Sequence, residues 1–146
     1  MTVTSKVVVD TCVIVDMLVA SRPRHKQADL LRRLFSERKI RARIPYFAIF
    51  EISHALRQEK RLSEAKFLAD EEIPAELVPV DREFLKAYFD ETLPEMRAGD
   101  LVFASMAHVD KLPLVTEDAG LAKSARAAGI DVKSIAEMLE ALENAV

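Results

Sequence analysis

The feature that most constrains the fold is a run of three valines, Val7 to Val9, that ends in Asp10 and Thr11. β-Branched residues without polar alternation are typical of a strand buried on both faces, as in a parallel sheet. In open α/β sheets, ligands bind outside the carboxyl ends of the strands. Asp10 would lie at such an end, so the run predicts a buried strand that presents a carboxylate to a candidate ligand site.

A second stretch near the carboxyl terminus repeats this pattern. The apolar residues Leu112 to Val115 are followed by the hydroxyl of Thr116 and then by Asp118. Carboxyl ends of parallel strands meet at one edge of a sheet, so we expect Asp118 to approach Asp10 there.

The rest of the chain alternates short apolar segments with amphipathic ones. We expect further strands at residues 41–44, 75–80 and 130–132, and helices at residues 11–18, 25–39, 46–59, 63–69, 81–89, 99–108, 118–128 and 135–142. This alternation predicts an α/β protein with three α/β/α layers and a mostly parallel central sheet. The length suits one core, and no linker or repeat interrupts it, so we expect a single domain over residues 1–146.

Composition narrows the class of protein. Cys12 is the only cysteine, which excludes an internal disulfide and is typical of a reducing compartment. No apolar run approaches the roughly 20 residues of a membrane helix, and the N-terminus lacks the order of a secretory signal. We therefore expect a soluble cytoplasmic protein with no membrane partner.

The net charge of −3 hides an asymmetry along the chain. Residues 22–66 carry 13 Lys and Arg against 5 Asp and Glu, whereas the remainder carries 8 basic and 19 acidic residues. Such a basic segment can attract a phosphate backbone. The same side chains can equally be solvated helix faces.

Two further acids are predicted to face inward from helices. Glu51 falls inside the apolar stripe of its helix, between Ala48 and Ala55. An ionised glutamate on a buried face is costly unless it has a partner. Asp100 shares a helix face with Phe103 and lies in the first turn, where the helix dipole favours an anion.

Four acids therefore occupy strand ends or apolar helix faces: Asp10, Glu51, Asp100 and Asp118. Like charges raise one another's pKa, so such a cluster requires a counter-ion. Oxygen-only ligands favour Mg²⁺ or Mn²⁺ over zinc. A metal held this way suits phosphodiester hydrolysis, with Thr11 and Thr116 able to orient a ligand or the attacking water.

Each acid also has a simpler interpretation when it is taken alone. Asp10 and Asp118 can cap helices, Asp100 can be a partner of a helix dipole, and Glu51 can pair with a buried arginine. Asp16 lies further along its helix, and we expect it to be exposed or paired on the helix surface. The histidines are scattered, so we expect structural or surface roles for His25, His54 and His108.

Other phosphoryl-transfer classes fit poorly. A haloacid-dehalogenase-like phosphatase would need a second acid where Cys12 stands, and we expect Cys12 to be a small buried residue instead. Three glycines in the whole chain leave little room for a glycine-rich phosphate loop.

The order of the motifs resembles the PIN-domain ribonuclease family, especially the toxin subunits of VapBC-type toxin–antitoxin pairs. The pieces that carry the resemblance are Val8-Val9-Asp10-Thr11, Phe50-Glu51-Ile52, residues 97–104 with Ala107, and Leu114-Val115-Thr116-Glu117-Asp118. The resemblance implies metal-dependent endonucleolytic cleavage of RNA, homodimerisation, and inhibition by an antitoxin peptide that enters the acidic site.

The resemblance also assigns roles to single residues. Asp10 and Asp100 would bind Mg²⁺ or Mn²⁺, and Glu51 would complete the shell or take the proton from the attacking water. Asp118 would bind a second ion or hold water in the outer shell. Arg97 could contact a phosphate or a glutamate, or form a surface ion pair. The alternative to an enzyme is a non-catalytic module on the same fold that binds RNA or a protein partner.

Overall fold

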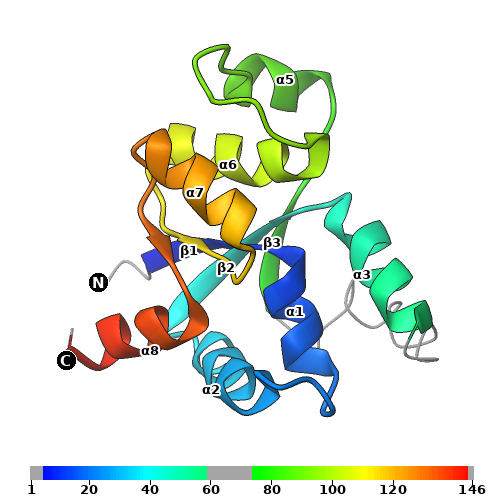
Figure 1. Cartoon of the computed structure of the whole chain (residues 1–146), viewed down its shortest axis with the longest axis vertical. Coiled ribbons are helices and arrows are strands. Elements are labelled where there is room, and N and C mark those ends of the chain that lie inside the picture. Colours follow the sequence, from blue (N-terminus) through cyan, green and yellow to red (C-terminus); the bar gives the residue numbers. More distant parts are fainter. Residues whose placement is uncertain (1–4, 59–73, 145–146) are drawn as a thin grey trace.

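A single parallel sheet forms the centre of the protein (Figure 1), whose computed structural model describes residues 5–58 and 74–144. Within those ranges all strand pairs are parallel, and the strand order is β3-β2-β1-β4-β5. The strands are β1 (Ser5–Val9), β2 (Ile40–Pro45), β3 (Ala75–Val78), β4 (Leu114–Val115) and β5 (Val132–Lys133). The predicted α/β class with a parallel sheet is confirmed.

Helices cover both faces of this sheet (Figure 1). In the described part of the chain they are α1 (Thr11–Leu18), α2 (His25–Ser36), α3 (Ala48–Gln58), α5 (Arg82–Tyr88), α6 (Ala98–Asp110), α7 (Ala119–Ala127) and α8 (Ile135–Asn144). Helices α6 and α7 pack together on one side, while α1, α2 and α8 lie on the other. This arrangement gives the three expected layers.

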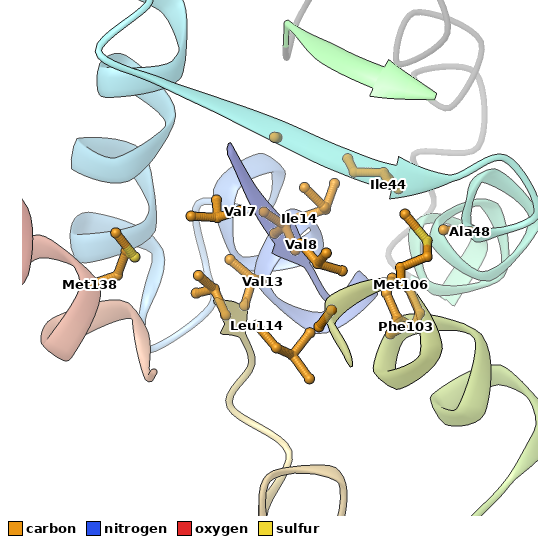
Figure 2. Close-up of a cluster of buried hydrophobic side chains, with 14 of the residues drawn as sticks. Val7, Val8, Val13, Ile14, Ile44, Ala48, Phe103, Met106, Leu114 and Met138 are labelled. Carbon is orange, nitrogen blue, oxygen red and sulfur yellow. The ribbon is translucent and has the colours of Figure 1, made fainter. Parts of the chain in front are cut away.

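The valine run forms the central strand of the core. Val7, Val8 and Val9 are each at most 1% exposed. Figure 2 shows Ile14 of α1 and Phe103 of α6 among the buried side chains around β1. Full burial of a valine stabilises a fold by about 1.5–3 kcal/mol, so β1 anchors both layers.

The sheet changes direction of winding beside β1. The chain runs from β1 outward to β2 and β3, and then crosses back to place β4 on the other side of β1. Val9 pairs with Val115 in this register, so Asp10 and Thr116 follow two adjacent strand ends. Ligands of open α/β sheets bind at such a switch point, which makes this edge the candidate site.

Some predicted boundaries differ from the structure. The helix expected at residues 25–39 ends at Ser36, because Arg38 adopts a left-handed backbone with φ of 58°. There the amides of Arg38 and Lys39 bond back to the carbonyls of Phe35 and Leu34, which closes the last turn. The helix expected at residues 63–69 lies outside the described residues.

Candidate active site

Four acids lie at the N-terminal ends of four helices that begin beside the carboxyl edge of the sheet. Asp10 and Asp118 are the N-caps of α1 and α7, and Glu51 and Asp100 lie in the first turns of α3 and α6. The N-terminus of a helix carries a partial positive charge that stabilises a nearby carboxylate. The helix ends therefore favour the acids that the sequence singled out.

Asp10 is the most enclosed of the four, at 7% exposure. Its Oδ1 accepts a hydrogen bond from the backbone amide of Thr11 at 2.8 Å. Its Oδ2 accepts from the Thr116 hydroxyl at 2.7 Å and from the Cys12 thiol at 3.2 Å. An ionised carboxylate offers about four acceptor positions, so these three donors leave room for one further ligand.

The environment of Asp10 raises its pKa above the ordinary value. Burial is the largest cause, and the charge of Asp100 adds to it, whereas the hydrogen bonds from Thr116, Cys12 and Thr11 oppose it. The Cys12 thiol responds to the same surroundings. Burial and then the charge of Asp10 raise the pKa of Cys12 to about 12, so the thiol stays protonated and acts as a donor.

Thr116 connects Asp10 to Asp118. The Thr116 side chain is buried and donates to Asp10, while its oxygen accepts from the backbone amide of Asp118 at 3.0 Å. The Asp118 carboxylate in turn accepts from the amide of Leu121 at 2.9 Å and caps α7. One hydroxyl thus fixes the distance between the two strand ends.

Glu51 reaches the site from α3. Its Oε1 accepts a hydrogen bond from the Thr11 hydroxyl at 2.9 Å. Its Oε2 lies close to Gly99, because a Cβ added to that glycine would be 3.3 Å from this oxygen. Partial desolvation is the largest cause of a raised pKa at Glu51. The charges of Asp10 and Asp100 add to the shift, and Thr11 and Arg97 oppose it.

The expected position of Glu51 on a buried helix face is wrong. The buried stripe of α3 consists of Ala48, Ile52 and Leu56, and Glu51 is exposed beside it. Side chains of a helix lean toward its N-terminus, so Glu51 in the first turn points past the helix toward the sheet edge. The carboxylate reaches the site from the solvent side.

Arg97 forms ion pairs with two of the site acids. Its guanidinium lies 3.3 Å from Asp100 Oδ2 and 3.3 Å from Asp118 Oδ2. The Arg97 side chain is 79% exposed, whereas those of Asp100 and Asp118 are 18% and 34% exposed. Of the roles considered for Arg97, the structure shows a surface ion pair, and its partners are the acids of the site.

The donor atoms suit a hard divalent cation held with the help of water. Among the described residues, no three Asp, Glu, His or Cys side chains approach closely enough to enclose a metal ion. Mg²⁺, however, keeps several waters and commonly binds through one or two carboxylates. Asp10 and Asp100, whose charges repel each other, are carboxylates of this kind. The residues present therefore fit Mg²⁺ or Mn²⁺.

Asp16 was assigned incorrectly from the sequence. It is 1% exposed, and its carboxylate accepts from the Nε atoms of Arg22 at 3.0 Å and Arg24 at 3.1 Å. Arg24 also lies 3.8 Å from a Glu117 oxygen. The two arginines that follow α1 were the signal that this aspartate is ion-paired. The contact between Arg24 and Glu117 links the connection after α1 to the loop after β4.

These pairs occupy part of the basic segment. Arg32 and Arg33 also pair with Asp29 within α2, and Arg43 pairs with Asp110 of α6. A share of the local positive charge is therefore neutralised within the fold. The segment contributes less to phosphate attraction than its composition suggested.

Comparison with known proteins gives a family and a fold. The sequence model of the PIN domain matches residues 7–127. No curated protein matches the chain by sequence.

None of the helices in the described ranges is long and apolar enough to cross a membrane.

Three solved structures share the fold at low identity. VapBC2 of Rickettsia felis, bound to a promoter DNA fragment, is 12% identical with a TM-score of 0.62, covering 88% of this chain and 98% of that one. VapC20 of Mycobacterium tuberculosis, a toxin that cleaves the Sarcin-Ricin loop, is 14% identical with a TM-score of 0.63, covering 85% and 95%. FitAcB of Neisseria gonorrhoeae is 20% identical with a TM-score of 0.61, covering 88% and 97%.

Proposed function

The chain belongs to the PIN-domain family, and on that premise we propose that it is a metal-dependent endoribonuclease that hydrolyses RNA phosphodiester bonds. The observation that carries the proposal is the position of Asp10. It is a buried acid at the end of the central strand, with one acceptor position open and the charges of Glu51 and Asp100 within reach. A perturbed carboxyl cluster of this kind is typical of functional sites.

The site residues divide the work of hydrolysis. Asp10 and Asp100 would hold Mg²⁺ or Mn²⁺, and Asp118 would bind a second ion or order water at the outer edge. When bound, a divalent ion supplies Lewis acidity and neutralises charge on the phosphate. Glu51 would accept the proton of the attacking water, because its raised pKa makes it a better base than an ordinary glutamate.

Two threonines would keep these acids in register. The Thr11 hydroxyl holds Oε1 of Glu51, so Oε2 would be the oxygen that accepts the proton. Thr116 holds Asp10 and the Asp118 backbone at a fixed separation. Both contacts position groups in advance of the reaction, which lowers the cost of reorganisation.

We further propose that the protein is the toxin of a VapBC-type toxin–antitoxin pair, acting in the cytoplasm as a homodimer. Support comes from the order of the acidic motifs and from the fold shared with VapBC2, VapC20 and FitAcB. The partner would be an antitoxin protein whose peptide enters the acidic site. The cleavage activity of VapC20 on the Sarcin-Ricin loop makes RNA the substrate to test first.

The test compares two buried aspartates of the same strand–helix unit. Wild-type protein should cleave total RNA with Mn²⁺ and stop when EDTA is added. Asp10→Asn should lose at least about 100-fold in rate, because several kcal/mol of metal-dependent stabilisation would disappear. Asp16→Asn is the matched control, since Asp16 is also buried, but its carboxylate pairs with Arg22 and Arg24. The Tm of this control shows whether loss of a buried carboxylate alone unfolds the chain. Cleavage by Asp10→Asn at the wild-type rate would refute the assignment.

A second candidate is a non-catalytic PIN-fold module that binds RNA or a protein partner. One observation favours it: Arg97 already neutralises Asp100 and Asp118. This candidate predicts that RNA is retained in EDTA, that added Mn²⁺ produces no cleavage, and that Asp100→Asn changes little. Mapping of RNA ends after incubation with the wild-type protein and with Asp100→Asn distinguishes the two candidate functions.

A further inference from the structure

A single guanidinium bridges two helices at the edge of the acid cluster. Arg97 is the N-cap residue of α6, and it pairs with Asp100 one turn later and with Asp118 at the start of α7. Helices α6 and α7 pack side by side (Figure 1), so the bridge joins two neighbouring N-termini. Its charge also reaches Glu51, whose pKa it lowers.

The contacts of Arg97 are those of a counter-ion that can leave. All three of its contacts are 3.3 Å long, and two of them fall on one oxygen, Oδ2 of Asp100. With 79% of its side chain exposed, Arg97 can exchange these contacts for water at little cost. The Asp100 carboxylate is largely covered, whereas the Arg97 guanidinium is solvated. The ion pair therefore stabilises the charge of Asp100 more than that of Arg97.

We propose that Arg97 is an internal competitor of the divalent cation held by Asp10 and Asp100, and of any second ion at Asp118. This inference rests on the metal site of the proposed function and adds a control element to it. In the ion-free protein the guanidinium neutralises Asp100 and Asp118 across the α6–α7 junction. A cation that binds to the same oxygens must displace Arg97 or bind beside its charge, so Arg97 weakens the apparent affinity for the ion.

The direction of the effect separates competition from ligand positioning. If Arg97 competes, its removal strengthens cation binding. If Arg97 instead holds Asp100 and Asp118 in a binding geometry, its removal weakens binding. A unit charge about 5 Å from a divalent ion in nearly aqueous screening changes the binding constant by about tenfold, so the two outcomes are well separated.

The experiment is calorimetric titration of Mn²⁺ into the metal-free full-length chain. Arg97→Gln should bind Mn²⁺ about tenfold more tightly than wild type, and Arg97→Lys, which keeps the charge, should remain within about threefold of wild type. Arg33→Gln is the matched control. Arg33 is also exposed, and it pairs with Asp29 at the same 3.3 Å distance, but on α2. It should bind Mn²⁺ as wild type does.

Each outcome bears on a different claim. Tighter binding by Arg97→Gln, or binding by that variant where wild type shows none, supports competition. Equal or weaker binding by Arg97→Gln, with normal binding by wild type, overturns the competition and leaves the proposed function standing. No Mn²⁺ binding by any variant overturns the metal site itself. A larger Mn²⁺-induced rise in Tm for Arg97→Gln would support the calorimetric result without any measurement of activity.

Discussion

Thr116→Val removes a hydroxyl that joins the two strand ends of the acid cluster. Thr116 donates to Asp10 Oδ2 at 2.7 Å and accepts from the amide of Asp118 at 3.0 Å. Valine has nearly the same shape, so the change deletes these two hydrogen bonds, and a weak 3.9 Å contact with the Cys12 sulfur, without opening a large cavity. Thr116 is 3% exposed, and water cannot readily replace the lost hydroxyl.

The structure allows the cost to be worked out from these two contacts. A hydrogen bond to a charged group contributes about 1.5–3 kcal/mol, and the bond to the Asp118 amide adds about 1 kcal/mol. We therefore expect the free energy of unfolding to fall by about 2–4 kcal/mol. For a chain of this length, about 1 kcal/mol corresponds to roughly 2–4 °C, so Tm should fall by about 5–15 °C.

The free energy of unfolding that Thr116→Val loses should become smaller as the pH falls. The Thr116 bond stabilises the ionised form of Asp10 and lowers its pKa, against the larger effect of burial, which raises it. The contribution of the bond is therefore complete when Asp10 is ionised, and it fades as the pH falls through the pKa of Asp10 in the folded protein. Because that pKa is raised, the fading begins above the range of an ordinary aspartate.

Urea denaturation in EDTA at several pH values measures both effects. Thr116→Ser keeps the hydroxyl and is the control, although it loses a methyl group from the core. The reasoning would be refuted if Thr116→Val matched Thr116→Ser at about pH 7, or if the deficit of the valine variant grew in acid. Either result would mean that the hydroxyl does not serve the Asp10 carboxylate.

Three further predictions concern neighbours of the cluster. Thr11→Val should raise the pKa of Glu51 further, because the Thr11 bond lowers it, and the acid limb of a kcat/KM profile should move to higher pH. Gly99→Ala places a Cβ 3.3 Å from Glu51 Oε2, so cleavage should fall several-fold. Alanine is favoured over glycine in a helix, so Tm should stay equal or rise, and a lower Tm would contradict this prediction. With its pKa near 12, Cys12 should resist iodoacetamide at about pH 8 until urea is added, as followed by mass spectrometry, and rapid labelling of folded protein would contradict the assignment.

Much of the fold could be predicted from local patterns. The valine run before Asp10 forms the central strand, and the carboxylate lies at its end beside Thr116, as the apolar–polar boundary indicated. The strands and helices in the described ranges follow the predicted order. These features depend on residues close in sequence, so the pattern contains the information needed to place them.

Contacts between distant segments were harder to predict. The stripe of α3 was recognised, but the exposed position of Glu51 depends on where α3 begins relative to the sheet edge. Asp16 looked like a surface acid because its partners, Arg22 and Arg24, follow in a connection whose path the sequence does not specify. The bridge from Arg97 to Asp118 likewise depends on the packing of α6 against α7.

The acid cluster imposes a cost on the fold that its surroundings only partly offset. Each helix N-terminus near a carboxylate contributes about 0.3–1 kcal/mol, and Arg97 neutralises charge at Asp100 and Asp118. Even so, the pKa values of Asp10 and Glu51 stay raised, so the folded state disfavours their ionised forms. At neutral pH, ionisation of the two acids therefore lowers the free energy of unfolding relative to their protonated forms. A cation bound between them would remove this penalty, so the proposed metal site would account for acids that otherwise lower the stability of the fold.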